Sequence, residues 1–294
     1  MRRITKHCIL TLQVLALILP ATALGKEGGD QYSNGAEGFL AGALPPPGHY
    51  FINYAGYYTG KAMNKDGEEI SGVEVSAVFD ALRYVRVTPI KLLGADWGFH
   101  VILPVVRQNI ETPAGDNAVT GLGDITIDPL VLGWHQPAFH YTVGLDVNLP
   151  TGRYDKKKPL ECIGANYVSV EPVFALTYLH ASGVEGSVKL MYNLKTENSD
   201  TKYKSGSEFH ADYLAGYHKK DWAYGVGGYL LSQLDDDKLD GTTVEDKKGQ
   251  VIAVGPQVQY TIQGRSIILK WHHEVSATNR FGGDKVFLKF VTKI

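Results

Sequence analysis

The sequence predicts an all-β fold, namely a transmembrane antiparallel up-and-down β-barrel of about twelve strands. Three observations support this fold class. From residue 49 onward, apolar and polar residues alternate in runs of about 9–11 residues, which suits a tilted membrane-spanning strand. Short and long connections alternate between these runs, as in outer-membrane barrels. Beyond the N-terminus, no apolar stretch is long enough for a transmembrane helix.

Residues 1–25 have the layout of a secretory signal peptide. Basic residues precede an apolar run at 9–19, and small residues follow that run. We expect cleavage after Ala23 or Gly25. Cys8 would leave with the signal, so Cys162 would be the sole remaining cysteine and no intramolecular disulfide is expected.

Residues 26–48 are rich in glycine and proline and include the run Pro45-Pro46-Pro47. Consecutive prolines favour an extended polyproline conformation. We therefore expect a periplasmic lead-in before a single barrel domain at residues 49–294. The alternative is a plug that enters the lumen, with Phe39-Leu40 as its apolar anchor.

Within the barrel domain, the clearest strand runs from His140 to Leu149. One face carries apolar residues such as Val143 and Val147, and the other carries polar residues such as Asp146. The same sorting recurs along the chain. Strands are expected near residues 49–58, 73–88, 95–108, 124–134, 139–149, 167–179, 183–194, 208–218, 222–234, 250–262, 265–276 and 285–293.

The connections between these strands alternate in length. Short connections are expected at residues 89–94, 135–138, 180–182, 219–221 and 263–264. Long connections are expected at residues 59–72, 109–123, 150–166, 195–207, 235–249 and 277–284. An even number of strands places both termini at the end with the short turns, which is the periplasmic side for this class.

Four prolines lie inside expected strands: Pro104, Pro129, Pro172 and Pro256. A proline removes one hydrogen bond from the ladder between strands. We therefore expect bulges or bends at these positions.

Four segments carry a family resemblance: residues 35–50 (GAEGFLAGALPPPGHY), Gly121-Leu122-Gly123-Asp124 followed by Pro129, residues 149–154 (LPTGRY), and Gly255-Pro256. Together they resemble the outer-membrane family named for the meta-pathway of phenol degradation, also called the SphA family. The resemblance implies a membrane barrel thought to pass hydrophobic or aromatic small molecules into the periplasm. It supplies no catalytic residues.

The inward face of the expected barrel is polar. Its lumen-lining candidates are His100, Asp128, His140, Asp146, Glu171, Glu185, Lys189, Glu208, His210, Asp212, Gln257, Gln259, Lys270, His272 and Glu274. Isolated buried charges are costly, so these groups must be hydrated or paired with one another. Two interpretations stay open: a salt-bridged network that fills the barrel, and a wet pathway. About twelve strands enclose a narrow lumen in either case.

The function expected from the sequence is an outer-membrane channel or facilitator for small hydrophobic or aromatic molecules. The alternatives are a closed structural or binding barrel and an outer-membrane lipid hydrolase. We expect no enzyme, because the outward-facing His273 has no convincing outward serine partner. His272, His273 and Glu274 alternate between two faces, so no metal site is expected there.

The expected partners follow from the location in the cell outer membrane. They are membrane lipids and lipopolysaccharide, a small hydrophobic or aromatic solute, and the barrel-assembly machinery. Ile294 ends the chain where such barrels usually end in an aromatic residue, and Phe290 lies on the same face. No cofactor is expected. A near-neutral net charge of −2, without a basic stripe interleaved with aromatic residues, argues against nucleic acid.

Overall fold

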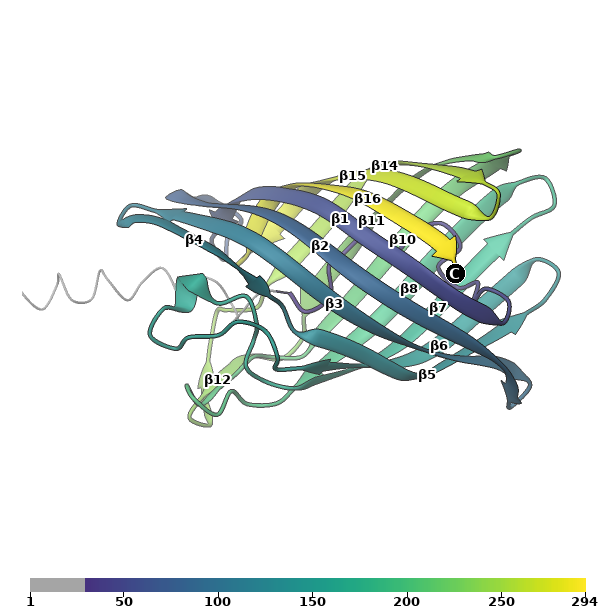
Figure 1. The fold of residues 1–294 in the computed structure, drawn as a ribbon. Helices are drawn as coiled ribbons and strands as arrows, with labels where there is room; N and C mark the ends of the chain where they lie inside the picture. The colour runs from purple at the N-terminus through teal and green to yellow at the C-terminus, as the bar shows by residue number, and fades with distance from the viewer. Residues whose placement is uncertain (1–29) are drawn as a thin grey trace, which may run out of the picture.

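The computed structural model describes residues 30–294, and twelve antiparallel strands within this range close into a barrel (Figure 1). The predicted fold class is thus confirmed. The signal peptide at 1–25 and residues 26–29 lie outside the described residues. The barrel strands are β1 (Gly48–Met63), β2 (Glu69–Leu92), β3 (Ala95–Thr112), β5 (Ile125–His135), β6 (Phe139–Leu149), β7 (Ser169–Leu179), β8 (Val184–Lys195), β10 (Glu208–Lys219), β11 (Trp222–Gln233), β14 (Gln250–Ile262), β15 (Arg265–Thr278) and β16 (Phe281–Lys293).

Each strand pairs with its neighbours in chain order, and β1 closes the ring by pairing with β16. One further strand, β4 (Gly115–Leu122), pairs with residues 105–112 of β3 and so extends the barrel wall beyond the start of β5. The C-terminus lies at the same end as the short turns (Figure 1). By the usual rule for such barrels this is the periplasmic end, and the opposite end is extracellular.

Three of the predicted long connections are wrong, because the strands on either side continue toward each other. At residues 277–284, β15 ends at Thr278 and β16 begins at Phe281, so only residues 279–280 form the turn. Residues 59–72 are mostly strand, and the turn spans only residues 64–68, where Asn64 Oδ1 accepts the N–H groups of Asp66 and Glu68. Residues 109–123 are likewise filled by the end of β3 and by β4. The polar residues there cover a sheet that projects beyond the membrane, and polarity alone does not distinguish that from a loop.

The other extracellular connections carry short elements of their own. A 3-10 helix, η1, spans Pro159–Glu161, and a small sheet joins β9 (Tyr203–Lys204), β12 (Asp237–Leu239) and β13 (Thr242–Val244). Asp237 ties this sheet together by accepting the N–H of Gly206 at 2.7 Å. Burial raises the pKa of this carboxyl group, while hydrogen bonds from Tyr203, Gly206 and Gln233 act in the opposite direction.

Of the four strand prolines, Pro129 lies at a register shift, between Ile127 and Leu132 of β5. The expected bulges at Pro104, Pro172 and Pro256 are not seen in the pairing registers of the described strands. Pro104 lies where β3 exchanges β5 for β4 as its partner. Pro172 and Pro256 stay in register with β6 and β11. Each proline therefore removes one hydrogen bond between strands without shifting the pairing of its strand.

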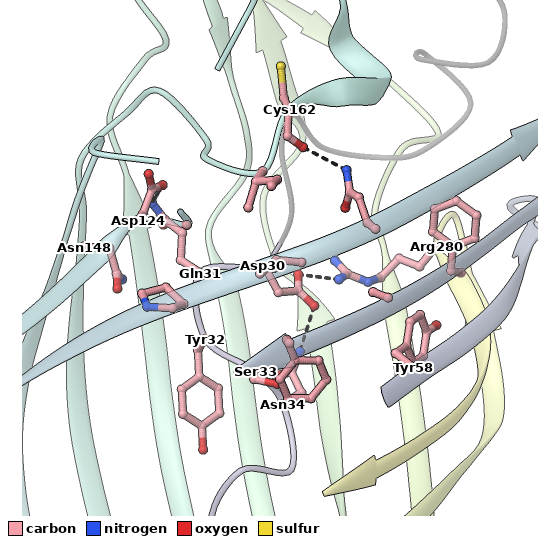
Figure 2. A pocket seen from close by; sticks show the side chains of 18 of the residues that line it. Asp30, Gln31, Tyr32, Ser33, Asn34, Tyr58, Asp124, Asn148, Cys162 and Arg280 are labelled. Atoms are coloured by element: carbon pink, nitrogen blue, oxygen red, sulfur yellow. Dashed lines mark hydrogen bonds and ion pairs between the residues drawn. The ribbon is translucent and has the colours of Figure 1, made fainter. Parts of the chain in front are cut away.

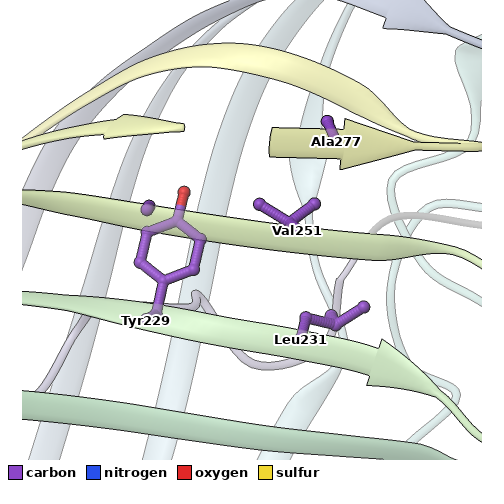
Figure 3. Packing of buried hydrophobic residues seen from close by; sticks show 5 residues of the cluster. Tyr229, Leu231, Val251 and Ala277 are labelled. Atoms are coloured by element: carbon purple, nitrogen blue, oxygen red, sulfur yellow. The ribbon is translucent and has the colours of Figure 1, made fainter. Parts of the chain in front are cut away.

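The two faces of the barrel differ as the alternation requires. Large apolar residues are exposed on the outer face, among them Val226, Leu269 and Leu288, where lipid would cover them. Part of the inner face is also apolar. In Figure 3, a cluster of Tyr229, Leu231, Val251 and Ala277 lines the inside of β11, β14 and β15. Within residues 30–294, no helix is long and apolar enough to cross a membrane.

Candidate functional site

The barrel interior is occupied by the chain's own N-terminal segment, residues 30–47. The sequence placed residues 26–48 in front of the barrel as a periplasmic lead-in, with a plug as the alternative. In the structure, residues 30–47 instead make hydrogen bonds to side chains of eight barrel strands, namely β1, β2, β6, β7, β8, β10, β15 and β16. The reason is physical: the polar lumen offers partners to backbone groups of a segment that forms no sheet of its own.

Asp212 on β10 holds the middle of this plug segment. Its carboxylate accepts the backbone N–H of Gly35 at 2.8 Å and that of Glu37 at 3.0 Å, and also the hydroxyl of Tyr32. Asp212 is 1% exposed, so these three donors replace the water that a buried carboxylate would otherwise need. Lys189 lies over the Tyr32 ring, 4.2 Å from its centroid.

Lys270 on β15 holds the same turn from the opposite side. Its ammonium donates to the carbonyl oxygens of Gly35 at 2.8 Å, Ala36 at 2.5 Å and Glu37 at 3.1 Å. Those three bonds use the full donor capacity of a lysine. The Glu37 side chain then pairs with Arg83 of β2 at 3.0 Å and with Lys289 of β16 at 2.5 Å. The plug is therefore fixed by charged groups on both sides of the barrel.

The lower part of the plug is held near the periplasmic end by a carboxylate, by two hydroxyl groups and by an apolar contact. The Thr142 hydroxyl donates to the carbonyl oxygen of Gly42 at 2.9 Å. Leu40 donates its N–H to Glu185, and Gly42 donates to the Thr177 hydroxyl at 2.9 Å. Phe39 packs against Leu214, as part of a buried apolar cluster. The apolar anchor suggested by Phe39 in the sequence is present.

The other lumen-lining candidates fall into separate groups. Besides Asp212, Lys270, Lys189 and Glu185, His210 contacts the plug, through Asn34 Oδ1 at 2.7 Å. Three carboxylates have partners on the barrel wall: Glu208 pairs with Lys195 and Arg280, Glu171 accepts from Asn193, and Glu274 accepts from Tyr58 and Tyr229. Of the two glutamines, Gln257 contacts His272 and Gln259 donates to Thr261. His140 lies apart, beside His135 at the periplasmic end. His100, Asp128 and Asp146 form a group of their own.

Above the plug lies a cavity of about 680 Å³. Plug residues 30–37 form part of its lining, and the extracellular connection around Cys162 lies at its other end (Figure 2). Figure 2 shows Arg280 reaching Asp30 across this space, where the two side chains form an ion pair. The cavity thus spans from the plug to the extracellular loops.

One wall of the cavity is apolar, and its residues were not among the candidates. These residues are Val75, Ala77, Phe79 and Ala81 of β2 and Ile102, Pro104, Val106 and Ile110 of β3. The alternation in the sequence indicates polar inward positions, so it gives no sign of an apolar inner wall. The available signal was the run at residues 101–106 (VILPVV), which is apolar on both faces instead of alternating. A strand with lipid outside and an apolar cavity inside has this pattern.

His100, Asp128 and Asp146 bring one imidazole and two carboxylates within 4.8 Å of one another. This geometry fits a metal ion, which the sequence did not suggest. Arg83 opposes it: its Nη2 lies 3.0 Å from His100 Nδ1, which places a fixed positive charge against the group. Elsewhere, His272 and Glu274 have the separate partners given above, and the outward His273 contacts Asp284 at 3.1 Å.

A family model described as "Putative MetA-pathway of phenol degradation" matches residues 59–290. The chain belongs to this family. The family resemblance read from the sequence is therefore confirmed, and the barrel fold agrees with the predicted place in the outer membrane. A search among curated proteins gave no match to the sequence.

Solved structures with the same architecture include an outer membrane channel from Pseudomonas putida F1, with a TM-score of 0.76 at 15% identity, covering 86% of this chain and 98% of that one. The transport unit of the autotransporter AIDA-I from Escherichia coli has a TM-score of 0.49 at 7% identity, with 87% and 95% covered. A TodX mutant, a monoaromatic hydrocarbon channel, has a TM-score of 0.47 at 10% identity, with 88% and 92% covered. At these identities the similarity to the Pseudomonas channel concerns the fold, and the two weaker ones support no conclusion.

Two of the segments that resemble the phenol meta-pathway family meet at Asp124. Its carboxylate accepts the N–H of Gly152 at 2.9 Å and that of Ala165 at 3.0 Å, and so ties both ends of the connection after β6 to the wall. It also accepts the Gln31 amide at 2.9 Å. Gly152 has no room for a side chain, because an added Cβ would lie 2.7 Å from Gly164 Cα. This family motif therefore joins the plug, the wall and an extracellular loop.

Replacement of Asp124 by alanine is expected to loosen the loop that it holds. Three buried or partly buried donors would lose their acceptor, at a cost of about 1–3 kcal/mol for each buried one. Trypsin should then cleave after Lys156 or Lys157 about tenfold faster than in the unchanged protein. The matched control is Asp116→Ala, on the exposed part of β4. Equal cleavage rates in all three proteins would contradict this role.

Proposed function

We propose that the protein is an outer-membrane channel for small hydrophobic or aromatic molecules, which bind in the cavity above the plug. The observation that carries this proposal is the apolar inner wall of β2 and β3. A barrel that only spans the membrane needs apolar residues outside and polar ones inside. Apolar side chains facing a cavity that opens toward the extracellular loops gain free energy when an apolar ligand replaces water, at about 25 cal/mol per Å².

The cavity has the size and lining of a small-molecule site. Its volume of about 680 Å³ lies within the range of about 300–1,000 Å³ typical for such sites. The wall is apolar, and charged groups such as Arg280 and Lys285 lie on other sides. The chain shares its fold with the P. putida protein that is an outer membrane channel, which is consistent with the proposal.

Passage into the periplasm requires movement of residues 30–47. In the structure they lie between the cavity and the periplasmic end and are held by Asp212, Lys270 and Glu185. The segment continues into β1 at its C-terminal end, near Gly48, and residues 30–47 make no strand pairing of their own. It is therefore the part of the lumen that can rearrange without breaking the barrel.

A tryptophan at position 81 is expected to abolish most of the uptake. Ala81 faces the cavity, so Ala81→Trp would place a large ring in the binding space. The matched control is Leu82→Trp, because Leu82 is the adjacent residue and lies on the outer face with 40% exposure. In proteoliposomes, naphthalene uptake should fall about tenfold in Ala81→Trp and stay unchanged in Leu82→Trp. Equal uptake by both variants, or uptake no faster than in empty liposomes, would contradict the proposal.

The extensive bonding of the plug favours a second candidate, a closed barrel that binds a ligand without passing it. Each of Asp212 and Lys270 makes three hydrogen bonds to the plug. The two candidates differ in one result. A closed barrel would bind naphthalene in detergent, and Ala81→Trp would weaken that binding, yet proteoliposomes containing it would take up no more than empty ones.

A further inference from the structure

Within the apolar part of the cavity, three polar atoms are buried without a hydrogen-bond partner. They are Arg83 Nε, His100 Nε2 and Asp146 Oδ1, and all three residues line the cavity. His100 and Asp146 are each 4% exposed. Buried polar atoms are nearly always hydrogen-bonded in native proteins, so three such atoms at one place without a hydrogen bond require an explanation.

The proton on the His100 ring can be assigned from its neighbour. Arg83 Nη2 lies 3.0 Å from His100 Nδ1, and a guanidinium group only donates. Nδ1 is therefore the acceptor, and Nε2 carries the proton of the neutral ring. That Nε2 atom lies within ion-pair distance of Asp146 Oδ1, at 3.0 Å, but the contact lacks the geometry of a hydrogen bond, so neither atom has a hydrogen-bond partner. A donor, His100 Nε2, and an acceptor, Asp146 Oδ1, thus lie next to each other, and each can still form a hydrogen bond with a ligand.

We propose that this triad of Arg83, His100 and Asp146 recognises a hydroxyl group on an otherwise apolar ligand. This inference rests on the proposed function and names the chemistry of the ligand. A hydroxyl group both donates and accepts, so it can donate to Asp146 Oδ1 while it accepts from His100 Nε2 or Arg83 Nε. The apolar body of the ligand would lie against Phe79, Ala81 and Ile102, which line the same cavity.

Other ligand chemistries fit this triad less well. A carboxylate would meet the negative charge of Asp146, with Asp128 close behind it. A cation would meet the guanidinium of Arg83, and a metal ion would also need the Nε2 lone pair that the proton occupies. A pure hydrocarbon would leave all three polar atoms unpaired. A neutral hydroxyl group meets none of these costs.

The test compares two probes of similar size and shape, 1-naphthol and 1-methylnaphthalene. Binding to the full mature protein in detergent is measured by titration calorimetry, with partition into empty micelles subtracted. 1-Naphthol is expected to bind about tenfold more tightly, because only its hydroxyl group can form hydrogen bonds with the charged groups of the triad. The preference should fall to nearly equal binding in His100→Phe and in Asp146→Leu. Gln259→Met, a change at a lumen residue outside the cavity lining, should keep it.

The outcomes separate the two proposals. Equal binding of both probes to the unchanged protein overturns the hydroxyl inference and leaves the proposed function standing, and this comparison needs no variant to fold. If neither probe binds, the proposed function fails as well. If Zn²⁺ binds in a 1:1 ratio, competes with 1-naphthol and no longer binds to Asp128→Asn, the group is a metal site and the inference is wrong.

Discussion

A variant that lacks residues 26–47 is expected to conduct ions at least about tenfold better than the intact protein. The lumen is narrow, and residues 30–47 occupy it from the cavity down to the periplasmic end. Deletion removes this obstruction, while the charged side chains that held it, among them Asp212 and Lys270, become available to water. The hydrated, charged lumen of a twelve-stranded barrel should carry an ion current. Single-channel recording in planar bilayers measures the change.

The control for this deletion keeps the chain length. A protein in which residues 26–47 are replaced by glycine and serine retains a tether but loses Tyr32, Glu37 and Phe39, the side chains that dock in the lumen. Its conductance should be intermediate and should fluctuate, because an unanchored segment enters and leaves the lumen. Unchanged conductance in both variants would mean that the loops or the barrel side chains close the pore, and the role assigned to the plug would be wrong.

Replacement of Asp212 by alanine should release the middle of the plug without deleting it. The hydroxyl of Tyr32 and the N–H groups of Gly35 and Glu37 would lose their acceptor. Each unsatisfied buried donor costs about 1–3 kcal/mol. A total of at least about 3 kcal/mol corresponds to amide exchange about a hundredfold faster in a peptide covering residues 30–42. Hydrogen exchange followed by mass spectrometry measures this directly.

Two companion variants show whether the effect belongs to this site. Asp212→Asn keeps one acceptor oxygen and should give a smaller increase in exchange. Asp236→Ala removes a carboxylate that is 39% exposed and pairs only loosely with Lys248, so it should leave residues 30–42 unchanged. If Asp212→Ala also left exchange unchanged, the hydrogen bonds to Asp212 would not be what holds the plug.

The barrel itself was predictable because alternation is a direct consequence of a strand between lipid and lumen. The predicted strand at residues 139–149 matches β6, and that at residues 222–234 matches β11 to within one residue. Strand ends were less predictable where the sheet projects beyond the membrane. There both faces meet water and the alternation weakens, which is why β4 was read as a loop.

The site was predictable only in part, for two physical reasons. Charged inward residues such as Asp212 and Lys270 were found because they fall on the polar face of strands whose other face is apolar. Their partners are backbone groups of the plug. Nearly every residue has a backbone N–H and carbonyl, so the sequence does not show which of them bind these side chains. The apolar wall around Phe79 was missed because an apolar residue facing a cavity has the same side chain as one facing lipid. Only the loss of alternation at residues 101–106 distinguishes it.

The most direct test of the closed lumen is the reactivity of a cysteine placed in the plug. Ala36→Cys is made with Cys162→Ser, so that no other cysteine remains after the predicted signal. Ala36 is 7% exposed beside Tyr54 and Phe287, whereas a control cysteine at Ala114 lies in an exposed extracellular turn. With a small charged methanethiosulfonate, the cysteine at position 36 should react at least about a hundredfold more slowly than the control, and Asp212→Ala should remove most of that protection. Equal rates at positions 36 and 114 in the otherwise unchanged protein would show that residues 30–47 do not occlude the barrel.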